Sequence, residues 1–147
     1  MDFTGKVALV TGGANGIGRA AALGFARLGA RVVVVDHDAT GGEAAAGAIQ
    51  QQGGEARFVA ADVSRSGDVQ NYVRETLDAY GAIDCFFNNA GIEGTMAHTV
   101  DYDEAMFDAV IAVNLRGVFL GLRHVLPVML RQRRGAVVNM ASTAALG

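Results

Sequence analysis

The sequence contains a single cysteine, a single proline and a single lysine, and such shortages narrow what the chain can do. One cysteine excludes a disulfide within the chain. Cys85 lies in an apolar run, which favours a buried strand thiol over a nucleophile. The 12 basic and 15 acidic residues give a net charge of −3, so we expect no nucleic-acid partner. The composition indicates one globular domain, residues 1–147, in a reducing, cytoplasmic setting.

Long uninterrupted apolar segments are also missing. The first residues show no basic stretch followed by an apolar one, so we expect no signal peptide. The longest apolar stretch, Val118–Leu130, is interrupted by Arg123 and Pro127, and we expect no membrane span. The three histidines share no ligand spacing and only one cysteine accompanies them, so we expect no metal site.

Short apolar runs alternate with amphipathic runs along the chain, which is typical of repeated βαβ units around a parallel sheet. We expect strands at residues 6–11, 31–36, 56–61, 83–88 and 135–141, and helices at 17–28, 40–52, 66–80 and 103–133. The strands are rich in valine, isoleucine, phenylalanine or alanine, as strands covered on both faces should be. The pattern therefore predicts an α/β domain.

The sequence predicts further features of the first and the last of these helices. The first is expected to stop at Gly29 and to bury one face, made of Ile17, Ala20, Ala21, Gly24, Phe25 and Leu28. The last contains Asn114, a poor helix former whose presence needs a reason. It ends in arginines 131, 133 and 134, which we interpret as complements to the helix dipole rather than a nucleic-acid site.

A glycine-rich turn, Thr11–Gly18 with the sequence TGGANGIG, joins the first predicted strand to the first helix. Phosphate groups bind backbone N–H donors at a helix N-terminus, and Gly12, Gly16 and Gly18 place no Cβ in their way. Eighteen residues after Gly18 the second strand ends in Asp36, whose carboxylate can accept hydrogen bonds from adenosine ribose hydroxyls. Together these features predict a dinucleotide site.

The residues around this predicted site favour NAD over NADP. Asn15 stands beside the second glycine of the motif, where a basic side chain would be available to hold a 2′-phosphate. Asp36 is followed by His37 and Asp38, and this acidic surrounding would repel that phosphate. We therefore expect NAD as the preferred cofactor.

Polar groups also follow the third and fourth predicted strands. Asp62-Val63 ends the third strand and Asn88–Gly91, with the sequence NNAG, ends the fourth. Ligands of open α/β sheets bind at this carboxyl edge. Asp62 could instead cap the helix that begins near Ser64, and the asparagines could form an ordinary strand-to-loop turn. The sequence leaves both alternatives open.

These motifs, with Asn114 and the segment Asn139–Ser142, resemble the short-chain dehydrogenase/reductase family in its TGxxxGxG/NNAG branch. The resemblance runs from Lys6 to Gly147 and covers the family's N-terminal cofactor-binding portion. It implies a Rossmann-type doubly wound parallel sheet of about five strands in the order 3-2-1-4-5. The family's last strands would be lacking and the NAD-binding domain incomplete at its C-terminus. The implied reaction is hydride transfer between a small-molecule secondary alcohol and a ketone.

The resemblance assigns a cofactor-binding set by position. Its members follow the dinucleotide from the pyrophosphate (Gly12, Gly16, Ile17 and Gly18) through the ribose (Asp36) and adenine (Asp62 and Val63) to the middle of the site (Asn89, Ala90 and Gly91). Asn15 and His37, which neighbour these positions, complete the predicted set.

The resemblance also assigns catalytic residues. Ser142 matches the serine that hydrogen-bonds the substrate oxygen, and Asn114 matches the asparagine that holds a water in the proton relay. Without the other motifs, Ser142 would be interpreted as a strand-end serine bonded to backbone. The family's general acid/base is a tyrosine, followed four residues later by a lysine, about a dozen residues beyond the serine. All three tyrosines precede Ser142 and the only lysine is Lys6, so the sequence contains no Tyr-x-x-x-Lys.

The absence of a Tyr-x-x-x-Lys pair determines which activity we expect of this chain. A phenol with an unperturbed pKa near 10 is a poor proton shuttle at neutral pH, so we expect the isolated chain to be inactive, with the pair supplied beyond Gly147. Two alternatives stay open, a non-catalytic NAD-binding module or sensor and a fragment that neither binds tightly nor folds alone. We expect the apolar open edge of the fifth strand to pair with another chain.

The resemblance implies a homo-oligomer for the full-length protein, formed through the long helix 103–133 and the helix after it. We do not expect that interface in this chain, which holds only the first of the two helices. Glu93–Met96 and Ala144–Leu146 are expected to border the substrate pocket.

Overall fold

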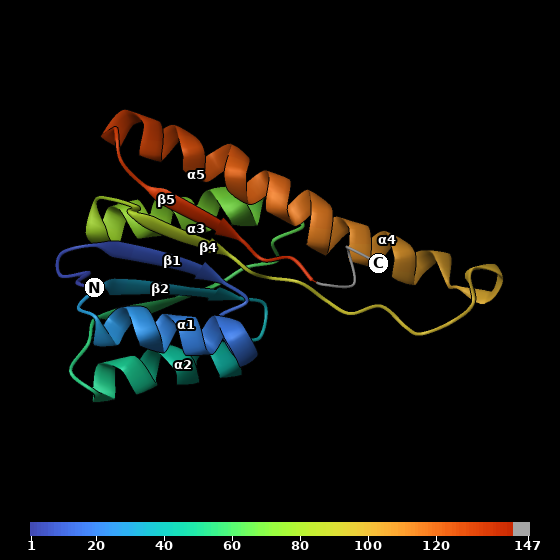
Figure 1. The fold of residues 1–147 in the computed structure, drawn as a ribbon, viewed down its shortest axis with the longest axis horizontal. Helices are drawn as coiled ribbons and strands as arrows, with labels where there is room; N and C mark the ends of the chain where they lie inside the picture. Colours follow the sequence, from blue (N-terminus) through green and yellow to red (C-terminus); the bar gives the residue numbers. More distant parts are fainter. Residues whose placement is uncertain (143–147) are drawn as a thin grey trace.

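A computed structural model describes residues 1–142 and contains one sheet of five parallel strands with helices packed against it (Figure 1). The strands are β1 (Val7–Thr11), β2 (Arg31–Asp36), β3 (Ala56–Ala60), β4 (Cys85–Asn88) and β5 (Ala136–Asn139). Before the long C-terminal helix come α1 (Gly16–Arg27), α2 (Ala39–Gln51), α3 (Ser66–Tyr80) and the 3₁₀ turn η1 (Thr99–Asp101). The sheet order β3-β2-β1-β4-β5 confirms the predicted Rossmann-type fold.

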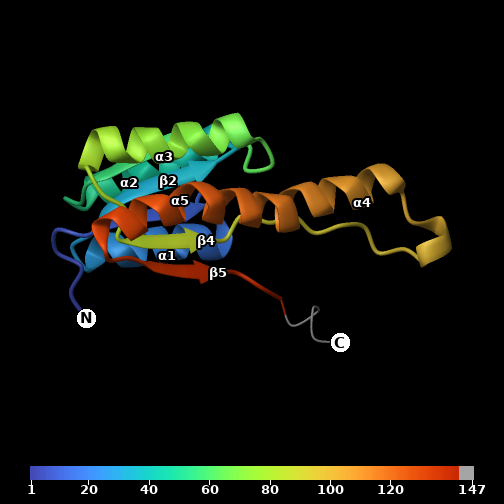
Figure 2. The same ribbon diagram turned by 90° about the horizontal axis from the view of Figure 1, so that it is seen from above.

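The sheet is covered on both faces at its centre. Helices α1 and α2 lie on one face, and α3 and the long C-terminal helix lie on the other (Figures 1 and 2). Alternate residues of β1 enter different cores: Leu9 packs with the α3 side, whereas Ala8 and Val10 pack with the α1 side. Because both faces are buried, the central strands are apolar without interruption, as the sequence predicted.

The two outer strands do not follow that prediction. In β3 Arg57 and Ala60 are exposed, and in β5 Val138 is 59% exposed. Each is a border strand of the sheet, with a neighbouring strand on one side only, and the helices extend only partly over it. Figure 2 shows β5 at the margin of the layers. The expectation of coverage on both faces is therefore wrong for these two strands.

The buried face of α1 also differs from the expected one. Ile17 and Leu28 are 63% and 41% exposed, whereas Gly18 and Ala22 are buried. A Cβ on Gly18 would collide with the carbonyl oxygen of Gly12, so only glycine allows the helix to approach the sheet so closely. Ala21 and Phe25 of the expected face do pack against the core, whereas Ile17 is left outside it. It ends as predicted, before Gly29, whose φ is 92°.

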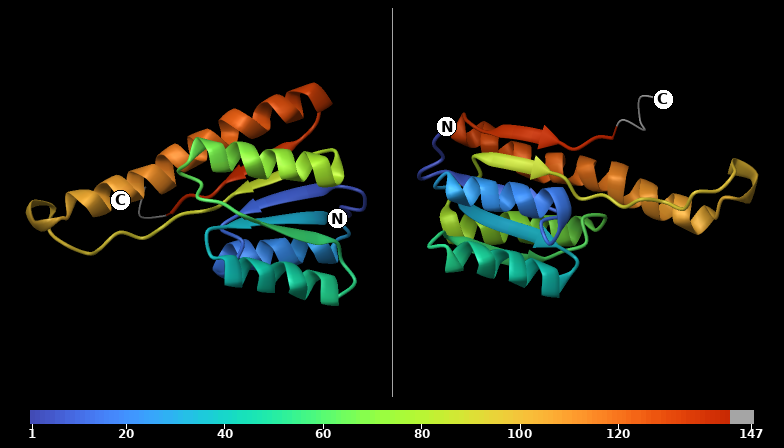
Figure 3. Two further views of the ribbon diagram at one scale, coloured as in Figure 1. Left: turned by 180° about the vertical axis from the view of Figure 1, so that it is seen from behind. Right: turned by 60° about the horizontal axis from the view of Figure 1, so that its bottom comes forward.

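A continuous helix follows η1 and extends beyond the carboxyl edge of the sheet (Figure 3). Its three parts are α4 (Glu104–Val110), the π-helical segment η2 (Ile111–Gly117) and α5 (Val118–Gln132). The expected helix 103–133 thus exists, but with a wider turn around Asn114.

The 29 residues Glu104–Gln132 are long and apolar enough, by length and composition, to cross a membrane. A mostly buried core helix of a soluble protein passes the same test; here 17% of the apolar window is buried, and the α5 part contributes Leu120, Val125 and Val128 to the core. The absence of a membrane span therefore stays a prediction.

The three arginines at the end of α5 have different surroundings from one another. Arg131 lies in the last turn, but Arg133 adopts φ 54° as the C-cap. Arg134 forms an ion pair with the buried Asp84, with Nε 2.7 Å from Oδ1. The helix-dipole interpretation therefore fits Arg131 and is wrong for Arg134, because Arg134 is turned back onto the start of β4.

Candidate functional site

A cavity of about 770 Å³ lies at the carboxyl edge of the sheet, where all five strands end. The predicted site residues in its lining come from segments far apart in the sequence: Gly12, Asn15, Gly16, Ile17, Gly18, Asp36, His37, Asp62, Val63, Asn89, Ala90, Gly91 and Ser142. The fold brings these predicted residues together around one space, and only Asn114 lies outside its lining.

The glycine turn forms the part of the cavity wall that lies at the N-terminus of α1. Gly12 and Gly16 have φ values of 66° and 50°, a region that disfavours other residues. A Cβ on Gly12 would lie 2.9 Å from the Cα of Ala90, whereas one on Gly16 would meet nothing within 4 Å. The Asn15 side chain does not cap α1, and the first turn holds no acidic residue. The first N–H groups of α1 are therefore available to an anion in the cavity.

Asp36 is held rigidly at the end of β2. Its carboxylate is 7% exposed and accepts hydrogen bonds from the backbone N–H groups of Ala14 and Asp38, each at 3.0 Å. The Nδ1 atom of the exposed His37 lies 3.2 Å from Asp36 Oδ1. The backbone bonds fix both oxygens, and each retains capacity to accept a further hydrogen bond.

Thr11 joins the ends of β1 and β4, a role that the sequence analysis missed. Its hydroxyl accepts hydrogen bonds from the backbone N–H groups of Asn89 and Ala90 at 3.0 and 3.1 Å. Asn89 returns a bond from Nδ2 to the Thr11 carbonyl at 2.9 Å. Asn88 is buried and donates to the Val118 carbonyl at 3.1 Å. These asparagines connect strands and a helix, which an ordinary turn does not require. A threonine ending a buried strand was the available signal for Thr11.

Asp62 organises the turn after β3. Its Oδ1 accepts hydrogen bonds from the Ser64 backbone N–H at 2.9 Å and the Ser64 hydroxyl at 2.7 Å. The helix begins later, at Ser66, so Asp62 is not its N-cap. The Ser64 hydroxyl is the main group that lowers the pKa of Asp62, so this carboxylate is charged at neutral pH.

Asn114 lies behind the cavity wall. Its side chain accepts from the Ile92 backbone N–H and donates to the Ile92 carbonyl, both at 2.9 Å. These paired bonds tie the segment after β4 to η2, the π-helical part of the long helix. They supply the reason for a poor helix former at this position, and π segments often occur at functional sites.

The segment after β5 completes the cavity. Met140, Ala141 and Ser142 line it, together with Ile92 and Glu93. The backbone N–H of Met140 donates to the Asn88 carbonyl at 3.0 Å, so this segment still follows β4. Of the expected border Glu93–Met96, Glu93 lies in the described lining and the other three residues do not, while Ala144–Leu146 fall outside the described residues.

The remaining reactive side chains of the described chain lie elsewhere. Tyr72 is fully buried in the core, and burial raises its pKa. None of the three tyrosines lines the cavity. Cys85 is half-buried rather than buried, and burial raises the pKa of its thiol, which disfavours a nucleophile. Within residues 1–142 no group of three or more acidic, histidine or cysteine side chains could hold a metal ion.

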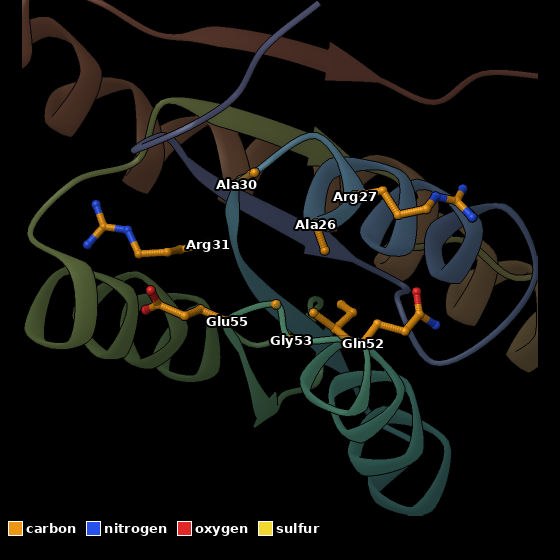
Figure 4. Close-up of a pocket in the computed structure, with 10 residues that line it drawn as sticks. Ala26, Arg27, Ala30, Arg31, Gln52, Gly53 and Glu55 are labelled. Atoms are coloured by element: carbon orange, nitrogen blue, oxygen red, sulfur yellow. The ribbon is translucent and has the colours of Figure 1, made fainter.

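A second hollow, of about 390 Å³, opens at the opposite edge of the sheet between the ends of α1 and α2 (Figure 4). It includes none of the predicted site residues. Figure 4 shows the head groups of Arg27 and Arg31 pointing in opposite directions. The Arg31 guanidinium stacks 5.2 Å from the Tyr80 ring centroid and donates to the Gly5 carbonyl. The two arginines of this second hollow therefore do not point toward a common binding position.

The chain is similar to known proteins over most of its length. The family model of the short chain dehydrogenases matches residues 6–147. Levodione reductase from Leifsonia aquatica is 45% identical over 146 residues, covering 98% of this chain and 55% of that protein. The chain spans about half the length of the curated relatives it matches.

Solved structures show the same fold. The crystal structure of levodione reductase has a TM-score of 0.96 at 45% identity, over 99% of this chain and 57% of that one. NAD⁺-bound xylitol dehydrogenase has a TM-score of 0.96 at 36% identity, over 99% of this chain and 56% of that one. With a family match over nearly its whole length, the chain belongs to the short chain dehydrogenase family of oxidoreductases.

Proposed function

We propose that these residues form the NAD-binding domain of a dehydrogenase that interconverts a secondary alcohol and a ketone. The observation that carries the proposal is the single cavity in which an uncapped helix N-terminus and an open glycine turn face the fixed carboxylate of Asp36. A dinucleotide requires both, because its pyrophosphate is an anion and its adenosine ribose is a hydrogen-bond donor. The NAD⁺-bound xylitol dehydrogenase among the similar structures supports this assignment.

Different residues of the chain would bind different parts of the dinucleotide. Gly12, Gly16, Ile17 and Gly18 would surround the pyrophosphate, Asp36 the ribose, Asp62 and Val63 the adenine, and Asn89, Ala90 and Gly91 the middle of the cofactor. The described cavity lining includes no lysine or arginine, and the absence of a fixed cation supports NAD over NADP. The bound nicotinamide would supply the hydride chemistry.

Ser142 would act on the substrate side of the cavity, whereas Asn114, which lies outside the described lining, would act through the segment after β4. Ser142 lines the cavity and would hydrogen-bond the substrate oxygen. Asn114 would keep the segment after β4 in place through its paired bonds to Ile92. A proton donor is still needed, and none of the three tyrosines is among the described lining residues; Tyr72 is in addition buried in the core with a raised pKa. The tyrosine and lysine would therefore have to come from outside these 147 residues.

Three further assignments belong to the same proposal. A small-molecule alcohol or ketone is the proposed substrate, in line with the names levodione reductase and xylitol dehydrogenase. The protein would work in the cytoplasm, without a nucleic-acid or membrane partner. A homo-oligomer is proposed for the longer protein and not for the isolated chain.

Fluorescence titration of the chain with NADH and NADPH near pH 8 tests the proposal. We expect NADH to bind more tightly, and Asp36→Asn to weaken NADH binding by about tenfold, because the ribose hydroxyls lose a charged acceptor. Asp38→Asn removes the same charge and retains a good N-cap for α2, so it should bind NADH as the original chain does.

Equal or tighter NADPH binding would reject the NAD assignment, and a lack of binding to either dinucleotide would reject the cofactor site. Oxidation of secondary alcohols by the isolated chain would contradict the proposed need for an external tyrosine and lysine. Binding without turnover by a longer protein that contains Tyr-x-x-x-Lys would favour the non-catalytic module.

A further inference from the structure

The π-helical segment η2 contacts two loops that belong to different ends of the cavity. One is the turn after β3, which supplies Asp62 and Val63 to the lining, and the other is the segment 91–98 after β4, which supplies Ile92. In the sheet, β2 and β1 separate β3 from β4, so the two loops begin three strand spacings, or about 14 Å, apart. The segment η2 therefore links two distant parts of the site.

Arg116 connects η2 to the turn after β3. Its guanidinium donates from Nη1 to the Ser64 carbonyl, 52 positions earlier in the chain. Asp62 holds that turn closed by accepting bonds from the backbone N–H and the hydroxyl of Ser64, at 2.9 and 2.7 Å. The next residue, Gly117, is buried against Val63, where a Cβ would lie 3.0 Å from the side chain. A turn with internal bonds and two contacts to η2 moves together with η2.

Asn114 connects η2 to the segment after β4. Its paired bonds hold both backbone groups of Ile92, each at 2.9 Å. Residues 93–98, which follow Ile92, belong to no helix or strand and are exposed. The paired bonds thus fix this exposed segment to the long helix, two positions away from Arg116.

Resting on the proposed function, we infer that Arg116 is a positioning residue that couples the adenine end of the cavity to the segment 91–98. A nucleotide bound against the turn after β3 restrains that turn. Arg116 passes the restraint to η2, and Asn114 passes it on to Ile92. Ordering one end of the cavity therefore makes the other end easier to order, so cofactor binding prepares the segment that is expected to border the substrate.

Amide hydrogen exchange of the chain with and without adenosine monophosphate tests this coupling. The probe has the adenine, the ribose and one phosphate, but no nicotinamide half that could touch residues 92–98. A calorimetric titration sets its saturating concentration. We expect exchange at residues 92–98 to slow by about fivefold on binding, the lower end of the coupling that linked sites commonly show.

Arg116→Ala should still bind the nucleotide, because Arg116 lies outside the described cavity lining, but binding should no longer slow exchange at residues 92–98. Arg116→Lys retains a donor for the Ser64 carbonyl and should restore most of the slowing. Arg123→Ala is the matched control, since it removes the same charge from an exposed position on α5, and it should behave like the original chain. A purely structural role of Arg116 would change exchange equally with and without the nucleotide.

The outcomes distinguish this inference from the proposed function. If the nucleotide binds but exchange at residues 92–98 does not change, or slows equally in Arg116→Ala, the coupling through Arg116 is wrong and the cofactor site stands. If neither adenosine monophosphate nor NADH binds, the cofactor site is rejected and this inference with it. Slowing that is lost in Arg116→Ala and retained in Arg123→Ala supports the inference.

Discussion

Polar side chains of the site have hydrogen-bond partners, whereas one polar side chain of the core does not. Asp36 has backbone donors on both carboxylate oxygens, and the Thr11 hydroxyl bonds two consecutive backbone N–H groups. Tyr72, in contrast, places its hydroxyl in the core, where it has no hydrogen-bond partner among the described residues. Leaving such a group unpaired costs about 1–3 kcal/mol.

Replacing Tyr72 by phenylalanine should therefore stabilise the chain. We expect the free energy of unfolding, measured by urea denaturation, to rise by about 1 kcal/mol because an unpaired hydroxyl is removed without changing the ring. Tyr80→Phe is the control, since Tyr80 is only half-buried and its change should be close to zero. A loss of about 1 kcal/mol or more in Tyr72→Phe would show that the hydroxyl has a partner, such as an internal water.

At the scale of elements, the long helix connects the sheet to the cavity wall. Its α5 part packs on the sheet, while η2 holds the segment after β4 through Asn114. Gly117, at the end of η2, packs against Val63, so a Cβ there would lie 3.0 Å from that side chain. The π segment therefore sets the distance between the helix and two of the loops that form the cavity.

Asn114→Ala should loosen the segment after β4. Both bonds to Ile92 are lost, and we expect faster amide hydrogen exchange at residues 91–98 and a stability loss of about 1–2 kcal/mol. Leu115→Ala, at an exposed neighbouring position, should leave the exchange of that segment unchanged. Unchanged exchange in Asn114→Ala would mean that other contacts hold the segment.

At the scale of the whole molecule, Asp84 links the amino edge of the sheet. Its carboxylate accepts the Val7 N–H of β1 at 3.0 Å and the Arg134 Nε at 2.7 Å. Burial acts to raise the pKa of Asp84, but the bonds from Arg134 and Val7 outweigh burial, and the pKa is lowered. The carboxylate thus joins β1, β4 and the turn before β5.

The lowered pKa gives this link a defined pH dependence. Its stabilisation is present above the unfolded-state pKa of about 4 and is lost as the pH falls through the folded-state value. Arg134→Ala should lower the free energy of unfolding at neutral pH by about 1–2 kcal/mol, since it leaves a buried carboxylate without its ion-pair partner while Arg134 itself is partly exposed.

The same variant should unfold at a higher pH in an acid titration followed by circular dichroism. Without the guanidinium, Asp84 takes up its proton earlier on the way to acid pH. Arg131→Ala removes an exposed arginine from the last turn of α5 and should change the acid midpoint little. An equal shift in both variants would point to net charge rather than to the Asp84 ion pair.

Much of the fold was predictable because it follows from local pattern. The alternation of apolar and amphipathic runs predicted the parallel strands and their helices, and the resemblance supplied the sheet order. The glycine turn and Asp36 could be placed at one edge because parallel strands all end there. The buried face of α1 was not predictable, since it depends on how closely Gly18 can approach Gly12.

Hydrogen bonds and ion pairs between residues far apart in the sequence could not be predicted from it. The bonds of Asn114 to Ile92 join positions 22 apart, those of Thr11 to Asn89 join positions 78 apart, and Arg134 meets Asp84 across 50. The sequence alone determined the type and order of the helices and strands and the kinds of side chain at the carboxyl edge of the sheet. These features depend on periodicity and residue type. Which side chains fasten that edge together, and which loops η2 connects, depends on three-dimensional distances that exist only once the sheet and its helices have packed.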